Sequence, residues 1–343
     1  MAAQGTPNEP RIFNHEDYTV GWVSALSSEL AAAMLMLDER HEALPSQEKD
    51  TNTYVLGRMG KHNVVVACLP AGTYGTVSAA TVAQNMARSF TSIRFGLMVG
   101  IGAGIPSKKH QIHLGDVVVG SPSGKNSGVV QYDFVRAEAD GTLTPIGSLN
   151  RPPQILLTAV ATLKAERLLG MKKIAPVVNA LDTENFEDPE EFEFPGANFD
   201  RLFQPDYLHL NEDKSCEECD PTKVDPRSSD RPRLKNNEPA IHYGIVASGN
   251  QLVRNTALRA RLRDEHHVCC IEMEAAGLMV EFPCLVVRGI CDYADSHKND
   301  QWQQYAALTA AVYAKHILGV VSPEQVKAEL TVTKAMNVSA PRS

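Results

Sequence analysis

The sequence predicts an α/β protein, a three-layer α/β/α sandwich in which helices cover both faces of a central mixed β-sheet. Three observations lead to this class. Apolar runs of strand length alternate with longer segments whose apolar residues recur at helical spacing. The strand-like runs are almost continuously apolar, as expected for strands that are buried on both faces. The chain has 343 residues, of which 43% are hydrophobic, so it can build a sizeable core.

The predicted strands and helices alternate along most of the chain. Strands are expected at residues 18–25, 53–59, 63–69, 96–99, 116–120, 244–247, 268–271 and 284–290. Helices are expected at residues 29–38, 77–88, 154–168, 257–263, 273–280 and 301–318. Apolar strands separated by helices indicate a partly parallel sheet that is covered on both sides.

Residues 17–320 are expected to form one domain with this architecture. Residues 182–240 interrupt this alternation, because they are rich in Asp, Glu, Pro, Ser and Asn and poor in aliphatic residues, and we predict a long surface insertion there. Residues 1–16 are predicted to be a disordered N-terminal tail. Residues 321–343 are predicted to be a C-terminal tail, in which residues 323–330 fit an additional helical segment.

The charge balance narrows the class of partner. Lys and Arg number 33 against 41 Asp and Glu, and the resulting net charge of −8 argues against a nucleic-acid backbone or an anionic membrane as the main partner. The sequence has no apolar run of membrane-spanning length, and its first residues do not resemble a secretory signal. Five of the seven cysteines lie in or beside apolar strand-like runs, which suits reduced, buried thiols. We therefore expect a soluble cytoplasmic protein.

Two glycine-rich segments are candidate ligand-binding turns. Residues 99–104 read V-G-I-G-A-G and residues 71–75 read A-G-T-Y-G, and each follows a predicted strand. Glycines allow the backbone to approach a ligand closely. Neither segment has the spacing of a dinucleotide-binding or P-loop motif, so an ordinary tight turn remains the alternative.

Carboxylates near the ends of predicted elements are the candidate acids and bases. Glu272 and Glu274 are two residues apart and cannot share one helical face, so at most one is expected to point into a pocket. Asp292 follows the apolar strand 284–290, where apolar shielding suits a general acid. Each has an ordinary alternative: Asp292 can cap a helix, and Glu29, Glu272 and Glu274 can be first-turn glutamates.

Six motifs, taken together and in this order, resemble the purine nucleoside phosphorylase/nucleosidase superfamily, and most closely the phosphorylase-like domains of fungi. The resemblance spans about residues 18–320. It implies a nucleoside phosphorylase-like fold that cleaves N-glycosidic bonds, with phosphate or water as the acceptor. The motifs are GWVSALSSE (21–29), LMVGIGAGIP (97–106), HLGDVVV (113–119), HYGIVASGNQ (242–251), EMEAAG (272–277) and RGICDYADSH (288–297).

The resemblance also implies roles for individual residues. Asp292 matches the aspartate that gives a proton to N7 of a purine, which stabilises the leaving base as an oxocarbenium-like sugar develops. Glu274 matches the glutamate that binds the ribose 2′- and 3′-hydroxyls, and Met273 the methionine that packs on the sugar. Further substrate contacts are expected from Gly102, Ala103, Ser248, Gly249, Leu252 and Val253.

Two positions favour water over phosphate as the acceptor. Phosphorylases of this superfamily usually have a phosphate-binding arginine where this sequence has Met98, so a charge-assisted contact is missing. Glu29 matches the glutamate that activates water in the methylthioadenosine/S-adenosylhomocysteine nucleosidases. The sequence therefore predicts a purine nucleoside or nucleotide N-ribosyl hydrolase with Asp292 and Glu29 as catalytic residues. A phosphorylase that uses Arg94 or Arg254 for phosphate is the alternative.

A non-catalytic, nucleoside-sensing signalling module is the third hypothesis, because related fungal domains often precede NACHT or repeat regions. Two observations favour an enzyme over such a module. Glu29, Glu274 and Asp292 are all present, and the chain ends at Ser343 without such a region. We expect no cofactor, a homo-oligomer, and a small-molecule substrate. Relatives of the resembled family remove adenine from ATP, and Leu252 replaces the usual stacking aromatic residue, so the substrate stays open between nucleoside and nucleotide.

The insertion contains one possible metal site. Cys216 and Cys219 form a C-x-x-C motif, and His209 precedes it by seven residues. These residues supply three of the four ligands that a structural zinc ion usually has. Reduced surface thiols without a metal are the alternative.

Overall fold

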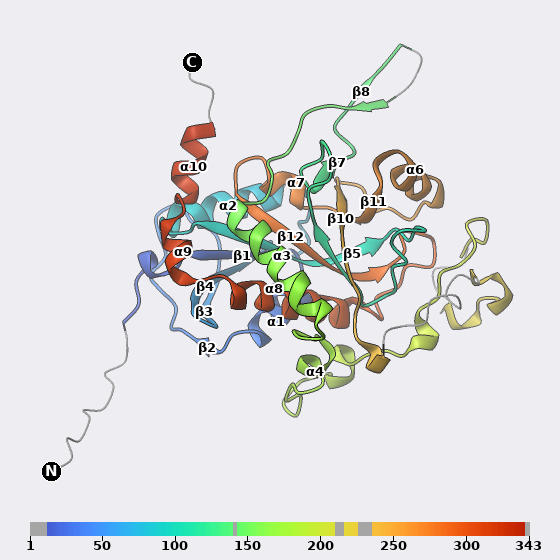
Figure 1. Cartoon of the computed structure of the whole chain (residues 1–343), viewed down its shortest axis with the longest axis horizontal. Coiled ribbons are helices and arrows are strands. Elements are labelled where there is room, and N and C mark those ends of the chain that lie inside the picture. The colour runs from blue at the N-terminus through green and yellow to red at the C-terminus, as the bar shows by residue number, and fades with distance from the viewer. Residues whose placement is uncertain (1–11, 140–142, 210–215, 226–234, 340–343) are drawn as a thin grey trace.

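A mixed β-sheet forms the centre of the computed structural model, which describes residues 12–139, 143–209, 216–225 and 235–339. Its strands are β1 (Val20–Ser24), β2 (Glu39–Arg40), β3 (Tyr54–Met59), β4 (His62–Cys68), β5 (Phe95–Gly104), β6 (Val117–Gly120), β7 (Val129–Gln131), β10 (Ile241–Ser248), β11 (Val268–Glu272) and β12 (Cys284–Asp292). A separate hairpin of β8 (Val135–Ala137) and β9 (Leu143–Pro145) projects from the body of the molecule (Figure 1).

The strands are arranged in the order β11-β10-β6-β12-β5-β1-β4-β3-β2, and β7 pairs with β10. The central pairs β4–β1, β1–β5 and β5–β12 are parallel, whereas β12–β6 and β3–β4 are antiparallel. The end of β5 also pairs with β11, since Ala103 and Gly104 lie opposite Ile271 and Cys270. This extra pairing joins β5, β11, β10, β6 and β12 into a closed ring, which the sequence did not predict.

Helices cover both faces of the sheet, which confirms the predicted α/β class. On one face α8 (Gln303–Val320) packs on β12 and β5 and contacts α1 (Ser27–Leu35), α3 (Gln154–Leu168) and α4 (Ala175–Val178). On the other, α2 (Thr76–Ser89) packs on β1 and β4 and contacts α7 (Ala275–Leu278), while α6 (Thr256–His266) lies beside β11.

In the described part of the chain no single helix is long and apolar enough to cross a membrane. Taken together, α8 and the segment 323–335 have the length and apolar composition of a membrane span, but the two helices are bent by 81° relative to each other. Most residues of α8 are buried inside the fold.

The C-terminal segment is not the tail predicted for residues 321–343. It contains α9 (Pro323–Ala328) and α10 (Val332–Ser339), and α10 contacts α2. Val326 and Val332 are buried, and Arg94 donates a hydrogen bond to the carbonyl oxygen of Glu329. The helical segment expected at residues 323–330 corresponds to α9, whereas α10 was not predicted, so the description as a tail was wrong for residues 321–339.

The N-terminal prediction lies mostly on residues 1–11, which are outside the described residues. Of the remainder, residues 15–17 form a 3-10 turn that Asn14 caps, and the ring of Phe13 stacks on His41 at a centroid distance of 3.9 Å. The end of the predicted disordered tail is therefore packed against the domain.

The predicted insertion is a run of short 3-10 turns that lies beside the sheet. Its described turns are Pro189–Phe192, Ala197–Phe199, Cys216–Glu218, Pro221–Lys223 and Lys235–Asn237. Parts of it are buried, notably Leu202 and Phe203. Asp200 is also buried and accepts hydrogen bonds from His113 at 2.7 Å and from the hydroxyl of Tyr293. The insertion is thus attached to the loop that follows β12.

Candidate active site

Several strands end around a cavity of about 300 Å³. The end of β1 leads into Ala25 and Leu26, β5 contributes its glycine-rich end, and β11 and β12 end at Glu272 and Asp292. In open α/β sheets, ligands bind beyond the carboxyl ends of the strands. Among its lining residues are Glu29, Gly102, Ala103, Leu252, Val253, Glu272, Met273, Glu274, Asp292 and Lys298.

Residues 99–104 belong to strand β5 rather than to a turn after it, so that part of the prediction was wrong. The glycines are needed for close contact with side chains. A Cβ atom on Gly100 would lie 2.2 Å from Oε1 of Glu29, and a Cβ on Gly102 would lie 2.5 Å from Sγ of Cys270. The absence of these Cβ atoms leaves room for the Glu29 carboxylate and for the thiol of Cys270.

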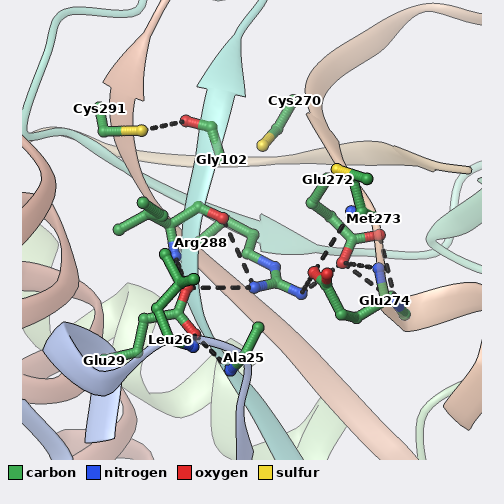
Figure 2. A network of polar contacts seen from close by, with 12 residues as sticks. Ala25, Leu26, Glu29, Gly102, Cys270, Glu272, Met273, Glu274, Arg288 and Cys291 are labelled. Carbon is green, nitrogen blue, oxygen red and sulfur yellow. Dashed lines mark hydrogen bonds and ion pairs between the residues drawn. The ribbon is translucent and has the colours of Figure 1, made fainter. Parts of the chain in front are cut away.

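Arg288 is the residue around which the acidic side chains gather (Figure 2). It lies in β12 and is fully buried. Its guanidinium forms an ion pair with Glu272, lies 3.6 Å from Oε2 of Glu274 and 3.9 Å from Oε1 of Glu29. Three carboxylates therefore share one guanidinium, and full ionisation would leave two negative charges uncompensated.

Glu29 lies at the third position of α1 and combines a structural role with a place in the cavity. Its Oε2 accepts hydrogen bonds from the backbone N–H groups of Ala25 at 2.5 Å and Leu26 at 3.1 Å, and its Oε1 accepts one from Ile101 at 2.8 Å. A carboxylate has about four acceptor sites, so one direction remains for a further donor such as water. The first-turn role expected as an alternative and a role at the site are thus compatible.

The two glutamates of β11 and α7 both line the cavity, contrary to the prediction that at most one would. Glu272 accepts hydrogen bonds from the backbone N–H groups of Glu274 and Ala275, so it caps α7 while it pairs with Arg288. Glu274 accepts a hydrogen bond from the N–H of Gly75 at 3.2 Å. The predicted glycine-rich turn 71–75 therefore contacts the site through Glu274.

Burial changes the acidity of this cluster. Burial, opposed by Arg288 and by three backbone hydrogen bonds, raises the pKa of Glu29 above its usual value. Burial, opposed by Arg288 and reinforced by Glu272 and Glu29, raises the pKa of Glu274 to about 7. Burial disfavours the charge of Arg288, but the surrounding carboxylates outweigh it and hold the pKa of the guanidinium above its usual value. The cluster can therefore take up or release a proton near neutral pH.

Asp292 also lines the cavity and is held by two strong contacts. Its Oδ2 pairs with Nζ of Lys298 at 2.8 Å, and its Oδ1 accepts a hydrogen bond from the N–H of Ala294 at 2.8 Å. Burial opposes the charge of Lys298, but Asp292 outweighs it and raises the pKa of the ammonium. Asp292 also lines a second cavity, of about 490 Å³, together with Lys298 and Arg254.

The predicted base-pocket residues are divided between the cavity and its support. Leu252 and Val253 line the cavity, and Leu252 is 59% exposed at its mouth. Ser248 is fully buried, and its hydroxyl accepts a hydrogen bond from the N–H of Ala276. A Cβ on Gly249 would lie 2.6 Å from the ring of Tyr132. Ser248 and Gly249 thus support α7 and the loop after β10 and do not line the cavity.

The residues considered for phosphate binding do not meet at this cavity. Met98 is fully buried in the apolar core, so its side chain lines no part of the site. Arg94 is bonded to the carbonyl of Glu329, and Arg254 lines the second cavity. The structural argument for water over phosphate as the acceptor therefore rests on the negative charge of the acidic cluster and not on Met98.

Arg288 and Lys298 are charged residues of the site for which the sequence predicted no role. Arg288 could have been noticed, because an arginine in the middle of an apolar strand is costly to bury unless carboxylates surround it. Lys298 gave no comparable signal, because it lies in a polar loop six residues after Asp292. Only the folded loop brings its ammonium to the carboxylate.

The fold and the position of this site are those of a nucleoside phosphorylase-like α/β protein. Residues 177–322 match the family model described as the Phosphorylase superfamily. The matched residues agree with the superfamily that the motifs resemble.

The similar proteins include two relatives that are longer than this chain. A nucleotide-binding leucine-rich repeat (NLR)-like protein from Hyaloscypha variabilis is 47% identical over 319 residues, 91% of this chain and 30% of that protein. The ATP nucleosidase Cap17 from Escherichia coli is 41% identical over 78 residues, 21% of this chain and 15% of that protein. The chain thus matches less than a third of either relative's length.

Solved structures support the fold. Futalosine hydrolase from Helicobacter pylori has a TM-score of 0.57 at 16% identity, and the match covers 89% of this chain and 99% of that one. The 5′-methylthioadenosine/S-adenosylhomocysteine nucleosidase of the same organism has the same score and identity, with coverage of 88% and 98%. At this identity the likeness establishes the fold, and it confirms the predicted class.

Proposed function

We propose that this chain is an N-ribosyl hydrolase that releases the base from purine nucleosides or nucleotides. The observation that carries the proposal is that Asp292 and Lys298 line the same cavity as Glu29 and Glu274, the two carboxylates that lie beside Arg288. A group that can protonate a leaving base and a carboxylate cluster that can stabilise an oxocarbenium-like sugar are the two requirements of the reaction.

In this proposal Asp292 serves the leaving group. As the bond between C1′ and N9 breaks, its electron pair passes into the purine ring, and N7 becomes basic enough to take a proton. Asp292 in its protonated form gives N7 that proton, the carboxylate that is left pairs with the Lys298 ammonium at 2.8 Å, and it takes its next proton from solvent. The ion pair also fixes the carboxylate in one orientation, so that little reorganisation is needed when the base leaves.

Glu274, Met273 and Glu29 serve the sugar and the water. Glu274 lies on the cavity wall beside Arg288 and accepts the hydrogen bonds of the ribose hydroxyls, while Met273 packs on the ring. Glu29 orients water through its remaining acceptor direction and takes a proton from it as the water oxygen attacks C1′. Water, rather than a dianion, suits the site because Arg288 is already shared among three carboxylates.

The name of the bacterial relative extends the proposal to nucleotides. Cap17 is an ATP nucleosidase, and 78 residues of this chain are 41% identical to it. The exposed side chains of Tyr74 and Leu252 at the mouth leave the cavity open to a substrate with a 5′-phosphate chain. We therefore include adenosine nucleotides, ATP among them, in the proposed substrate class.

A role as the nucleoside-binding part of a larger signalling protein is the second candidate. The 47% identity to one part of an NLR-like protein is the observation that favours it. The two candidates are compatible if binding is followed by cleavage, and they differ if the chain binds nucleosides without turnover.

A base-release assay separates these functions. Purified protein is incubated with adenosine, guanosine, inosine, cytidine, AMP and ATP in phosphate-free buffer, and free base is measured by liquid chromatography. The proposal expects purine release without phosphate, and much slower release in Glu274→Ala and in Asp292→Asn. Release only after phosphate is added would indicate a phosphorylase. Tight binding of a nucleoside without any release would favour the sensing module.

A further inference from the structure

The insertion brings together three side chains that can bind a metal ion. Nδ1 of His209 and the Sγ atoms of Cys216 and Cys219 all lie within 4.8 Å of one another. Nδ1 lies 3.2 Å from Sγ of Cys219 and 3.8 Å from Sγ of Cys216. With ordinary zinc bond lengths and tetrahedral angles, a nitrogen and a sulfur ligand are about 3.6 Å apart. The two observed distances bracket this value, and we propose that His209, Cys216 and Cys219 bind a zinc ion.

The chemistry of the three donors favours zinc over hard cations. Two thiolates and one imidazole are the ligands that borderline-soft zinc prefers, whereas calcium and magnesium prefer oxygen. All seven cysteines lie within the described residues and are free thiols, so Cys216 and Cys219 are available as ligands. The C-x-x-C spacing of the pair is typical of zinc sites.

The position of the cluster suggests what the metal would do. The N–H of His209 donates a hydrogen bond to Oγ of Ser296 at 2.9 Å, which metal binding would leave in place. The thiol of Cys216 donates one to the carbonyl oxygen of His297 at 3.4 Å, which a zinc-bound thiolate would give up. Ser296 and His297 belong to the loop that runs from Asp292 to Lys298. A zinc ion would therefore fasten the insertion to this loop and hold the lysine where it pairs with Asp292.

The fourth coordination position is assigned to water. His209 and Cys216 line the second cavity, of about 490 Å³, so the metal would face space that solvent can enter. His297 is the neighbouring imidazole, but its ring is stacked on Phe203 at a centroid distance of 3.9 Å and would have to leave that stack to become a ligand. A site with one solvent ligand exchanges its metal with chelators more readily than a closed site with four protein ligands.

Two metal-free states would also place His209, Cys216 and Cys219 close together. A hydrogen bond between the His209 imidazole and a cysteine thiol needs no metal. Oxidation of Cys216 and Cys219 would form a disulfide, with loss of two electrons and two protons to an oxidant. The experiment distinguishes both from the zinc site.

Metal content is the direct test. The full chain is purified without chelator and analysed by plasma mass spectrometry and by free-thiol titration. We expect about one zinc ion per chain, falling below about a tenth of that in Cys216→Ser and Cys219→Ser. Cys68→Ser is the matched control, since Cys68 is half-buried like Cys216 but lies in β4, and it should keep its zinc. Cys219→His should retain zinc, because histidine supplies a replacement ligand.

Cobalt substitution and local exchange test the site without relying on the variants' stability. Wild-type protein freed of zinc and loaded with Co²⁺ should show thiolate-to-cobalt charge-transfer absorption. Amide hydrogen exchange in residues 293–299 should accelerate at least about tenfold on zinc removal, and recover when zinc is added back. Metal-free wild-type protein with both thiols reduced, or with a disulfide between Cys216 and Cys219, would overturn the zinc site. Unchanged exchange in 293–299 would overturn its role in holding the loop.

Discussion

At the scale of single residues, the site depends on how a few charges are matched. Arg288 is buried in β12 and balances carboxylates that come from three different elements, namely α1, β11 and the start of α7. Asp292, four residues further along, is balanced separately by Lys298. In the proposed reaction these two groups have different tasks: the acidic cluster stabilises a developing sugar cation, and Asp292 serves the leaving base.

The substitution Asp292→Asn tests the proton donor. The amide keeps nearly the same shape and can still accept the hydrogen bond from Ala294, but it cannot transfer a proton. General acid catalysis typically contributes about 10²–10⁴-fold, so kcat for purine release should fall by that factor while the thermal midpoint changes little. A smaller loss of kcat is expected for Lys298→Met, which removes only the cationic partner of Asp292. Unchanged kcat in Asp292→Asn would leave Asp292 as a structural cap alone.

At the scale of elements, β5 is the strand on which the site is built. Its first half was predicted because residues 96–99 are continuously apolar or glycine, but its second half looks like a turn in sequence, since every other residue is glycine. Gly100 faces charged side chains that no local pattern predicts, because Glu29 and Arg288 are far from β5 in sequence. Similarly, α10 was missed, because its contact with α2 joins residues that are far apart in sequence. Strong local periodicity was predictable, and long-range pairing was not.

Gly100→Ala tests this interpretation of β5. The new Cβ would lie 2.2 Å from Oε1 of Glu29 and 2.5 Å from Nη1 of Arg288, so the buried cluster must shift. Overpacking of a buried site typically costs about 1–3 kcal/mol, and we expect this loss of unfolding free energy together with a fall in base release. Gly319→Ala in α8 is the control, because its Cβ would meet only the end of Lys172 at 3.9 Å. Denaturant unfolding should show the loss for Gly100→Ala alone; equal stabilities would mean that the cluster does not need the glycine.

At the scale of the whole molecule, the sequence predicted the layers, the superfamily and the acidic residues of the site. The motifs at residues 272–277 and 288–297 placed Glu274 and Asp292 on the cavity because both follow or end buried strands whose position is fixed by the sheet. The neighbours that set their charge, Arg288 and Lys298, depend on the closed ring of strands and on the loop that contacts the insertion. The cytoplasmic location and the homo-oligomer stay predictions from the sequence.

The buried acidic cluster should make stability depend on pH. The pKa of Glu274 is about 7 in the folded chain against an ordinary value of 4.5, so between these pH values the unfolded chain releases the proton that the folded chain keeps. Folding is therefore favoured at the acid end, and the unfolding free energy should fall by up to about 3 kcal/mol as pH rises through this range. The raised pKa of Glu29 acts in the same direction. Urea unfolding at pH 5 and pH 7.5 should show a smaller fall in Glu274→Gln than in the wild type; equal falls would contradict the assignment.

The origin of the oxygen atom in the sugar product tests the central claim most directly. The chain is given the best purine substrate of the base-release panel in ¹⁸O-labelled water that also contains phosphate, and the sugar is analysed by mass spectrometry. The proposed hydrolysis predicts ¹⁸O at C1 of free ribose or its 5′-phosphorylated form, with no dependence on phosphate. It also predicts that Glu29→Gln binds substrate but loses this product, because an amide cannot take a proton from water. Ribose 1-phosphate without label at C1, formed at a rate that rises with phosphate, would contradict the account.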